Sequence, residues 1–233
     1  MKAKLRSLLV AGAVSIMLCQ PSVAADVEVD PWEGFNRTMF SFNDGLDTYA
    51  LKPVSQGYKA IMPDIAETGV SNFFGNLADV GTLLNNLLQG KFSNATQDFA
   101  RIAFNSTFGL AGLIDVATPM GIDKHDEDFG QTFGYWGVDS GPYLVLPFFG
   151  PTTVRDGIGR VPDYLVDPVR QLDDNGARNA MYATRIINDR AELLEAEKLI
   201  SGDKYTFVRD AYLQKRAFSI VDGDGENYDE SNF

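Results

Sequence analysis

The chain has little of three kinds of residue that chemistry at protein sites usually needs. Its 233 residues include one cysteine, Cys19, and one histidine, His125. One cysteine makes no internal disulfide and no multi-thiolate metal site. Twenty Lys and Arg stand against 32 Asp and Glu, which gives a net charge of −12. This acidity argues against a nucleic-acid-binding protein, which needs clustered Lys and Arg, and against electrostatic docking on anionic headgroups, so that any membrane contact would have to be apolar.

Catalytic motifs are also missing. No serine lies in a Gly-x-Ser-x-Gly elbow, and no Gly-x-x-x-x-Gly-Lys-Ser/Thr loop is present. His125 lies within the acidic run Asp123–Asp128, where a solvated loop is favoured over a general base or a weak metal ligand. The run Asp222–Glu226 resembles the start of a calcium loop, but position 12 of that loop falls on Phe233 instead of a glutamate. The sequence therefore predicts no enzyme, no resident metal and no cofactor.

The chain has no hydrophobic run at its N-terminus that is long enough to span a bilayer. The apolar stretch there runs from Leu8 to Leu18, whereas a spanning helix needs ~20 residues. A positively charged start precedes this stretch, and a small-residue cleavage site ending at Ala24 follows it, which is the pattern of a secretory signal. We therefore expect a signal peptide over 1–24, a single helical domain over 25–221 and an acidic, disordered tail over 222–233.

Cys19 has two competing interpretations. Cleavage after Ala24 would remove it together with the signal peptide. Lipid attachment is the alternative, but a lipoprotein signal places a small residue directly before the modified cysteine, and here that residue is Leu18. The sequence favours removal of Cys19.

What the chain does contain is helical patterning at both ends. Phe35, Met39, Phe42 and Leu46 recur at steps of three or four, with Pro31 in the first turn and Asp30 as the expected cap. The same periodicity predicts helices over 64–89, from Ser93 or Asn94 onward, over 178–200 and over 203–219. Gly90 is the expected stop of the second helix and Asp203 the expected cap of the last. These segments predict an all-α fold.

The helix over 64–89 has two distinct faces. Phe73, Leu77, Val80, Leu84 and Leu87 share one face, and the periodicity predicts that this face packs while the amide and carboxylate residues face away. The residues expected to face away are Asn72, Asn76, Asp79 and Asn86.

Two segments in the middle of the chain are apolar and irregular. Phe108–Ile114 has no charge, and it suits either a buried bend in the core, which is favoured, or a hairpin tip inserted into one leaflet. Residues 119–160 are rich in glycine and proline, so we expect no long regular helix there. Within them, Pro142–Gly150 is predicted to be an extended segment crossing the core or an apolar surface.

A series of ordered blocks resembles the MlaA (VacJ) family of outer-membrane phospholipid-transport proteins. The blocks are spread over almost the whole chain after the signal. They are Asp30–Arg37, Lys52–Val54, Gly69–Leu77, Leu88–Gly90, Arg101–Asp115, Phe129–Gly134, Gly137–Gly150, Thr153–Asp156 and Tyr205–Phe218.

The resemblance implies a ring of amphipathic helices on the periplasmic side of the Gram-negative outer membrane, beside trimeric porins. Members of the family take phospholipids misplaced in the outer leaflet through a central amphipathic channel. They pass these lipids to a soluble periplasmic carrier and carry out no covalent chemistry. Many members are lipoproteins, and in this respect Leu18 before Cys19 departs from the family pattern.

On this resemblance we expect two apolar surfaces to contact lipid. The first, at the channel or at a hairpin beside it, consists of Phe108, Leu110, Leu113 and Ile114, with Gly109 and Gly112 as flexible points. The second consists of Leu144, Val145, Leu146, Phe148 and Phe149. Ordinary core packing is the alternative for each residue. The alternatives for the whole chain are a structural partner of a porin and a phospholipid-modifying enzyme.

Overall fold

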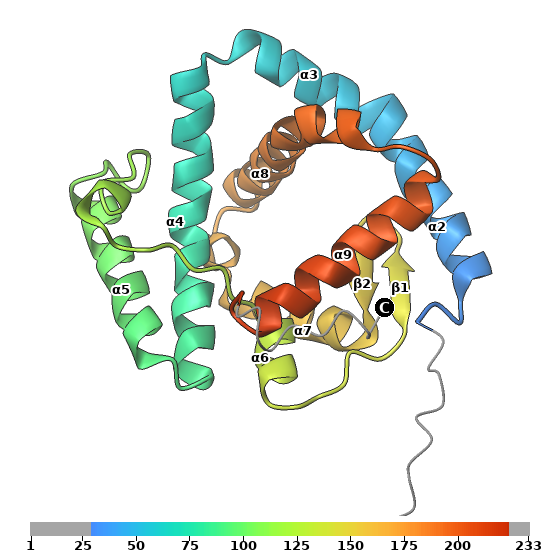
Figure 1. The fold of residues 1–233 in the computed structure, drawn as a ribbon. Coiled ribbons are helices and arrows are strands. Elements are labelled where there is room, and N and C mark those ends of the chain that lie inside the picture. The colour runs from blue at the N-terminus through green and yellow to red at the C-terminus, as the bar shows by residue number, and fades with distance from the viewer. Residues whose placement is uncertain (1–28, 224–233) are drawn as a thin grey trace, which may run out of the picture.

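The computed structural model describes residues 29–223, which form a helical fold with one short β-hairpin (Figure 1). The longer helices are α2 (Glu33–Leu46), α3 (Lys52–Ile61), α4 (Asp64–Leu88), α5 (Phe92–Thr107), α6 (Phe129–Tyr135), α7 (Val154–Val166), α8 (Asn175–Ala196) and α9 (Lys204–Ile220). The short helical turns are η1 (Asp47–Leu51), η2 (Thr118–Met120), η3 (Pro168–Gln171) and η4 (Glu197–Leu199). The strands are β1 (Tyr143–Leu146) and β2 (Gly150–Thr153).

The predicted helical class is therefore confirmed. Figure 1 shows α2, η1, α3 and α4 following one another along the periphery, with α8 and α9 inside this outline and α5 outside α4. A closed ring around a channel stays a prediction. Of the helices over 29–223, none is both long and apolar enough to cross a membrane.

The first helix continues into the next one, and Asp30 does not cap it. Helix α2 runs through the π-helical turn η1 directly into α3, and Trp32 is its N-cap residue. The carboxylate of Asp30 is instead buried, where it accepts hydrogen bonds from Asn36 Nδ2 at 2.7 Å and from the Tyr205 hydroxyl. The cap prediction was wrong because Asp30 joins α2 to α9.

Helices α4 and α5 form a tight antiparallel hairpin. Gly90 ends α4 as predicted, since its φ of 76° is left-handed and the N–H of Lys91 donates to the carbonyl of Asn86 at 2.9 Å. Ser93 and Asn94 do not cap α5, because the helix already begins at Phe92 with Lys91 as its N-cap residue. The turn is too short to leave either residue outside the helix.

The β-hairpin is held by two asparagines of α2. β1 pairs antiparallel with β2, with Tyr143 opposite Thr153 and Leu146 opposite Gly150. The Asn36 amide donates to the carbonyl of Tyr143 at 3.0 Å and accepts from the N–H of Val145 at 2.9 Å. Asn43, two turns further along α2, bonds to the carbonyl of Leu146 and the N–H of Phe148 in the same way. These side chains satisfy the backbone groups that the edge of β1 would otherwise leave unpaired.

The glycine-rich middle contains one longer helix that the sequence did not predict. Helix α7 begins inside the 119–160 segment, with the Thr153 hydroxyl accepting from the N–H of Asp156 as an N-cap. A Cβ on Gly159 would lie 2.5 Å from the backbone nitrogen of Gly130 in α6. The glycine therefore allows two helices to approach closely, and it does not mark a turn here.

The C-terminal helices agree with the sequence. α8 and α9 cover the two predicted segments, and the Asp203 carboxylate caps α9 by accepting from the N–H of Tyr205 at 3.2 Å. The apolar core of this part is small: Tyr143, Val145 and Tyr205 are buried, and Met39, Phe40, Tyr212 and Leu213 pack around them. The expected signal peptide, Cys19 and the tail beyond Gly223 lie outside the described residues.

Candidate functional site

The loop that follows α5 exposes its large apolar side chains. Phe108 is 68% exposed and Leu110 is 65% exposed, and Leu113 and Ile114 are also exposed. The favoured prediction of a buried bend was therefore wrong for these four residues. The side chains point outward because the loop folds its polar backbone inward.

The backbone of this loop bonds to itself and to the end of α5. The N–H of Gly112 donates to the carbonyl of Asn105 at 2.9 Å, and the N–H of Ile114 donates to the carbonyl of Gly109 at 2.9 Å. Leu110 and Ala111 have left-handed φ values of 53° and 59°, a conformation that costs L-residues energy. A structure that retains this strain must hold the loop firmly from elsewhere.

Gly109 and Gly112 are positions of close packing. A Cβ on Gly109 would lie 2.0 Å from the carbonyl oxygen of Ile114, and one on Gly112 would lie 2.7 Å from Cβ of Asn76 in α4. The expectation that these glycines act as flexible points does not match this arrangement, since each is in contact with a neighbour that leaves no room for a side chain.

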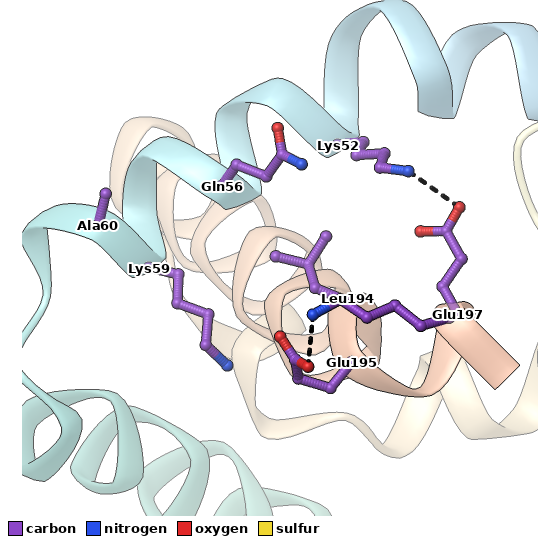
Figure 2. A pocket seen from close by; sticks show the side chains of 8 residues that line it. Lys52, Gln56, Lys59, Ala60, Leu194, Glu195 and Glu197 are labelled. Carbon is purple, nitrogen blue, oxygen red and sulfur yellow. Dashed lines mark hydrogen bonds and ion pairs between the residues drawn. The ribbon is translucent and has the colours of Figure 1, made fainter.

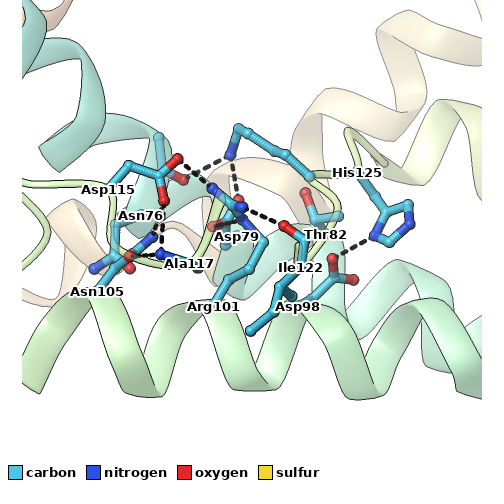
Figure 3. A network of polar contacts seen from close by, with 12 residues as sticks. Asn76, Asp79, Thr82, Asp98, Arg101, Asn105, Asp115, Ala117, Ile122 and His125 are labelled. Carbon is cyan, nitrogen blue, oxygen red and sulfur yellow. Dashed lines mark hydrogen bonds and ion pairs between the residues drawn. The ribbon is translucent and has the colours of Figure 1, made fainter. Parts of the chain in front are cut away.

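A polar network anchors the end of the loop (Figure 3). The Asp115 carboxylate accepts from Arg101 at 2.9 Å, from Asn105 at 3.1 Å and from the N–H of Thr118 at 3.1 Å. Burial alone would raise the pKa of Asp115, but the hydrogen bonds from Thr118 and Arg101 outweigh it and hold this pKa well below its usual range. Asp115 is therefore a charged, fixed anchor for the exposed loop.

The same network continues into the interface between α4 and α5. Arg101 and Asp79 are 2% and 1% exposed, and the closest approach of their charged groups is 3.6 Å. Lys124, which comes from the segment that crosses these helices, also donates to Asp79. Burial raises the pKa of Asp79, and the two cations oppose that rise. The buried contacts between these helices thus include an ion pair between Arg101 and Asp79 that is longer than a hydrogen bond, and a hydrogen bond from Asn86 to Asp98 at 2.7 Å.

His125 belongs to this network. Its Nδ1 lies 2.8 Å from the buried carboxylate of Asp98, which also accepts from Asn86 Nδ2 at 2.7 Å. The prediction of a solvated acidic loop was wrong for His125, since the ring bonds into the interface. Across residues 29–223, no group of three or more His, Cys, Asp and Glu side chains is arranged to hold a metal ion.

The second predicted surface is divided between core and surface. Tyr143 and Val145 are buried, Leu144 and Leu146 are half-buried, and Phe148 and Phe149 at the turn are 75% and 71% exposed. Both predictions for Pro142–Gly150 are therefore met in part, because alternate residues of β1 point to opposite faces. Phe148 also packs edge-on against Phe42 of α2, with ring centroids 5.3 Å apart.

The structure does not bring the two surfaces together. Figure 1 places the loop after α5 beyond α4, and it places the β-hairpin on the other side of the molecule near α2. Any lipid that contacts both would have to do so in succession, or two different lipids would occupy them.

The sequence analysis missed the polar network, and it assigned the faces of α4 incorrectly. Asn76, Asp79 and Asn86, expected to face away, are buried, whereas Val80 and Leu87 of the apolar face are exposed. Phe92 and Phe99 of α5 are exposed as well. Over the described residues the buried set is mostly polar, and the exposed set includes large apolar side chains of many helices. The signal in the sequence was the regular spacing of Asn and Asp on α4, which marks a shared polar face.

Comparison with known proteins identifies the family. A model of the MlaA lipoprotein family matches residues 28–219. The chain belongs to the MlaA lipoprotein family. The intermembrane phospholipid transport system lipoproteins MlaA of Shigella flexneri and Escherichia coli K12 are 38% and 37% identical over 201 residues, which is 84% of this chain and 80% of theirs.

A solved structure agrees with this family assignment. It comes from work on the structural basis for maintenance of bacterial outer membrane lipid asymmetry, and it aligns with a TM-score of 0.73 and 36% identity. The alignment covers 82% of this chain and 98% of the other. The helical architecture in Figure 1 is therefore that of the MlaA family.

Proposed function

We propose that this MlaA family member transports phospholipids without covalent chemistry and thereby maintains the lipid asymmetry of the outer membrane. It takes phospholipids misplaced in the outer leaflet through an amphipathic channel and passes them to a soluble periplasmic carrier. The function of its relatives from Shigella flexneri and Escherichia coli, intermembrane phospholipid transport, supports this proposal.

The observation that carries the proposal is the inverted distribution of polar and apolar side chains. A protein surrounded by water buries apolar side chains and rarely exposes many large ones together. Here Arg101, Asp79 and their neighbours are buried, while Phe92, Phe99 and Phe108 are exposed. Such a surface is stable against hydrocarbon, which favours a location in the outer membrane on its periplasmic side, beside trimeric porins.

Within this function we assign the two apolar surfaces to lipid. The loop with Phe108, Leu110, Leu113 and Ile114, held by Gly109 and Gly112, contacts acyl chains at the channel. Leu144, Leu146, Phe148 and Phe149 form the second contact. We further propose that signal cleavage after Ala24 removes Cys19, so that apolar embedding and porin contact retain the protein at the membrane.

The proposal is tested by surface-exposed phospholipid in a strain lacking the gene. Phospholipid should accumulate in the outer leaflet, and the wild-type gene should reverse this. Phe108→Ser combined with Leu110→Ser should fail to reverse it at equal protein level, because the loop loses its contact with acyl chains. Lys215→Gln on exposed α9 surface is the matched control and should restore fully.

The same strain separates the alternatives. His125→Asn keeps a donor for Asp98, so it should restore asymmetry; failure at equal protein level would favour a lipid-modifying enzyme. Absence of any accumulation in the deletion would rule out transport as proposed and would leave a structural partner of a porin as the better interpretation.

A further inference from the structure

A cavity of about 490 Å³ lies between α3 and the C-terminal end of α8 (Figure 2). This volume is within the range of ~300–1,000 Å³ that is typical of small-molecule sites. One wall carries Lys52, Gln56 and Lys59, which are spaced by four and three residues and therefore share one face of α3. The opposite wall carries Glu195, Glu197 and Lys198.

The cavity concentrates positive charge in an acidic chain. It contains three of the lysines between residues 29 and 223, namely Lys52, Lys59 and Lys198; the others are Lys91, Lys124, Lys204 and Lys215. In Figure 2 the side chains of Lys52 and Lys59 extend from α3 toward α8. In a protein with a net charge of −12, such a cluster is a specific feature and does not follow from composition.

The carboxylates at this cavity leave the lysines available. Lys198 and Glu195 are 2.6 Å apart but both largely exposed, and an exposed ion pair contributes little. Lys59 lies 3.6 Å from Glu67, which is longer than a hydrogen bond. An ammonium group has three N–H donors, so these contacts leave donors unused. Glu197 is neutralised from the other side as well, since Arg190 donates to it at 2.6 Å in addition to Lys52 at 3.1 Å. These hydrogen bonds hold the pKa of Glu197 low, at about 2.

A second cavity with a mainly apolar surface adjoins this charged one. Its volume is about 310 Å³, and Leu193, Ile200, Phe207 and Val208 line it between the end of α8 and the start of α9. The charged residues at its wall are Asp47, Arg190, Glu197 and Lys204. Glu197 lines both cavities. A ligand that uses both must have a phosphate-like anion at one end and a hydrocarbon chain at the other.

We propose that this pair of cavities is a phospholipid docking site, in which Lys52, Lys59 and Lys198 bind the headgroup phosphate and the apolar cavity takes part of one acyl chain. The inference rests on the proposed function, because it names the place where a transported lipid is recognised. It is separate from the loop after α5 and from the β-hairpin, which carry no lysine cluster.

Calorimetric titration of the purified mature chain in non-ionic detergent tests this site. The probe is a short-chain phosphatidylglycerol below its own critical micelle concentration. Lys52→Gln combined with Lys59→Gln should weaken binding at least about tenfold, because two charge-assisted hydrogen bonds are lost. Lys52→Arg combined with Lys59→Arg and the control Lys215→Gln should stay within about twofold of wild type. Far-ultraviolet circular dichroism establishes that the variants are folded.

Two further ligands separate the sources of the phosphate. The matching short-chain diacylglycerol should bind at least about tenfold more weakly than the phospholipid, and so should glycerol phosphate. If glycerol phosphate binds as tightly as the phospholipid, the site is one for free phosphate anions and the docking proposal fails. If wild type binds the phospholipid but the double Gln variant binds it equally, the docking site is wrong while the transport function stands. If wild type binds no phospholipid, both are wrong.

Discussion

The α4–α5 hairpin and the junction of α2, β1 and α9 differ in the side chains that they bury. Between α4 and α5 the buried groups are Arg101, Asp79, Asp98 and asparagines, while Phe92 and Phe99 lie outside. At the junction Tyr143, Val145 and Tyr205 form an apolar cluster, and Asp30 and Asn36 are the polar groups buried beside it.

The difference shows that two kinds of interaction stabilise different parts of the same chain. At the junction the removal of apolar area from water stabilises the fold, as in ordinary soluble domains. Between α4 and α5 the contact is made by ion pairs and amides, which hold together in a low-dielectric surrounding only when every partner is present. The α4–α5 hairpin, whose outer face carries Phe92 and Phe99, would remain stable if hydrocarbon replaced the water around it. The junction would be less stable in such surroundings.

The strongest test of the comparison is Arg101→Met. The change leaves the buried carboxylate of Asp79 with Lys124 alone and removes a donor from Asp115. We expect a loss of about 3–5 kcal/mol in the free energy of unfolding, because Asp79 loses one of its two cations and the buried hydrogen bonds of Arg101 to Thr118, Ile122 and Asp115 are lost together. Denaturant unfolding in detergent measures it, with the exposed Lys215→Met as control. A loss below ~1 kcal/mol would mean that the network does not hold the hairpin together.

At the junction, Tyr205→Phe is the corresponding change. It removes the hydroxyl that donates to Asp30, although Asn36 continues to donate at 2.7 Å. A hydrogen bond to a charged group contributes about 1.5–3 kcal/mol, so the loss should be smaller than that for Arg101→Met. The same unfolding measurement applies. The exposed Tyr49→Phe should leave stability unchanged, and an equal effect at both tyrosines would contradict the assignment.

The α6–α7 contact extends the comparison to pH. Burial raises the pKa of Asp163 from 3.8 to about 6, although the N–H of Phe129 donates to it at 3.0 Å and opposes the rise. The folded pKa lies above the unfolded one, so the folded state binds the proton more tightly. Stability from this group is therefore full below about pH 4 and is lost as the pH rises through about 6.

Asp163→Asn should raise stability at neutral pH and flatten this slope. The slope should shrink without vanishing, because burial also raises the pKa of Asp79 and Glu127. Thermal unfolding at a series of pH values between 4 and 7 measures it. The exposed Asp173→Asn is the control; if it flattens the slope as much, Asp163 is not the group responsible.

The smallest effect is expected for Tyr143→Phe. The Tyr143 hydroxyl is buried and has no hydrogen-bond partner among the described residues, unlike that of Tyr205. Burial raises the pKa of this hydroxyl, as expected for a phenol held neutral in the core. Its removal should leave stability unchanged or raise it by up to about 1 kcal/mol, because an unsatisfied polar group is costly. A loss above that amount would show that the hydroxyl makes a stabilising contact.

The positions of α4, α8 and α9 could be predicted from the sequence. The apolar spacing in 64–89, the left-handed Gly90 and the Asp203 cap are local properties, and the structure has them where the sequence places them. Two features could not be predicted: the π-helical turn between α2 and α3, and the start of α5 at Phe92 with Lys91 as its N-cap residue. Both depend on how the neighbouring elements meet.

The orientation of the helix faces could not be predicted from the same pattern. Periodicity shows that α4 has a polar and an apolar face, but it does not say which one is buried. Our assignment assumed water outside, and it was wrong for Asp79 and Asn86 and for the loop with Phe108. Gly159 misled for another reason, because the close approach of α6 and α7 that requires it is a tertiary contact.

The π-helical turn η1 sets the rotation of α3 about its own axis. A π turn holds one more residue than an α turn over about the same rotation, so η1 accommodates an extra residue between α2 and α3. Ser55, which donates to the carbonyl of Ile187, and Tyr58, which donates to Asn188, hold α3 against α8 in this rotation. If the same residues formed an α turn instead, α3 would turn by about 100°, the rotation of one residue, and these contacts would be lost together with the placement of Lys52 and Lys59 at their cavity. The π turn thus sets the angular alignment of the lysines with α8.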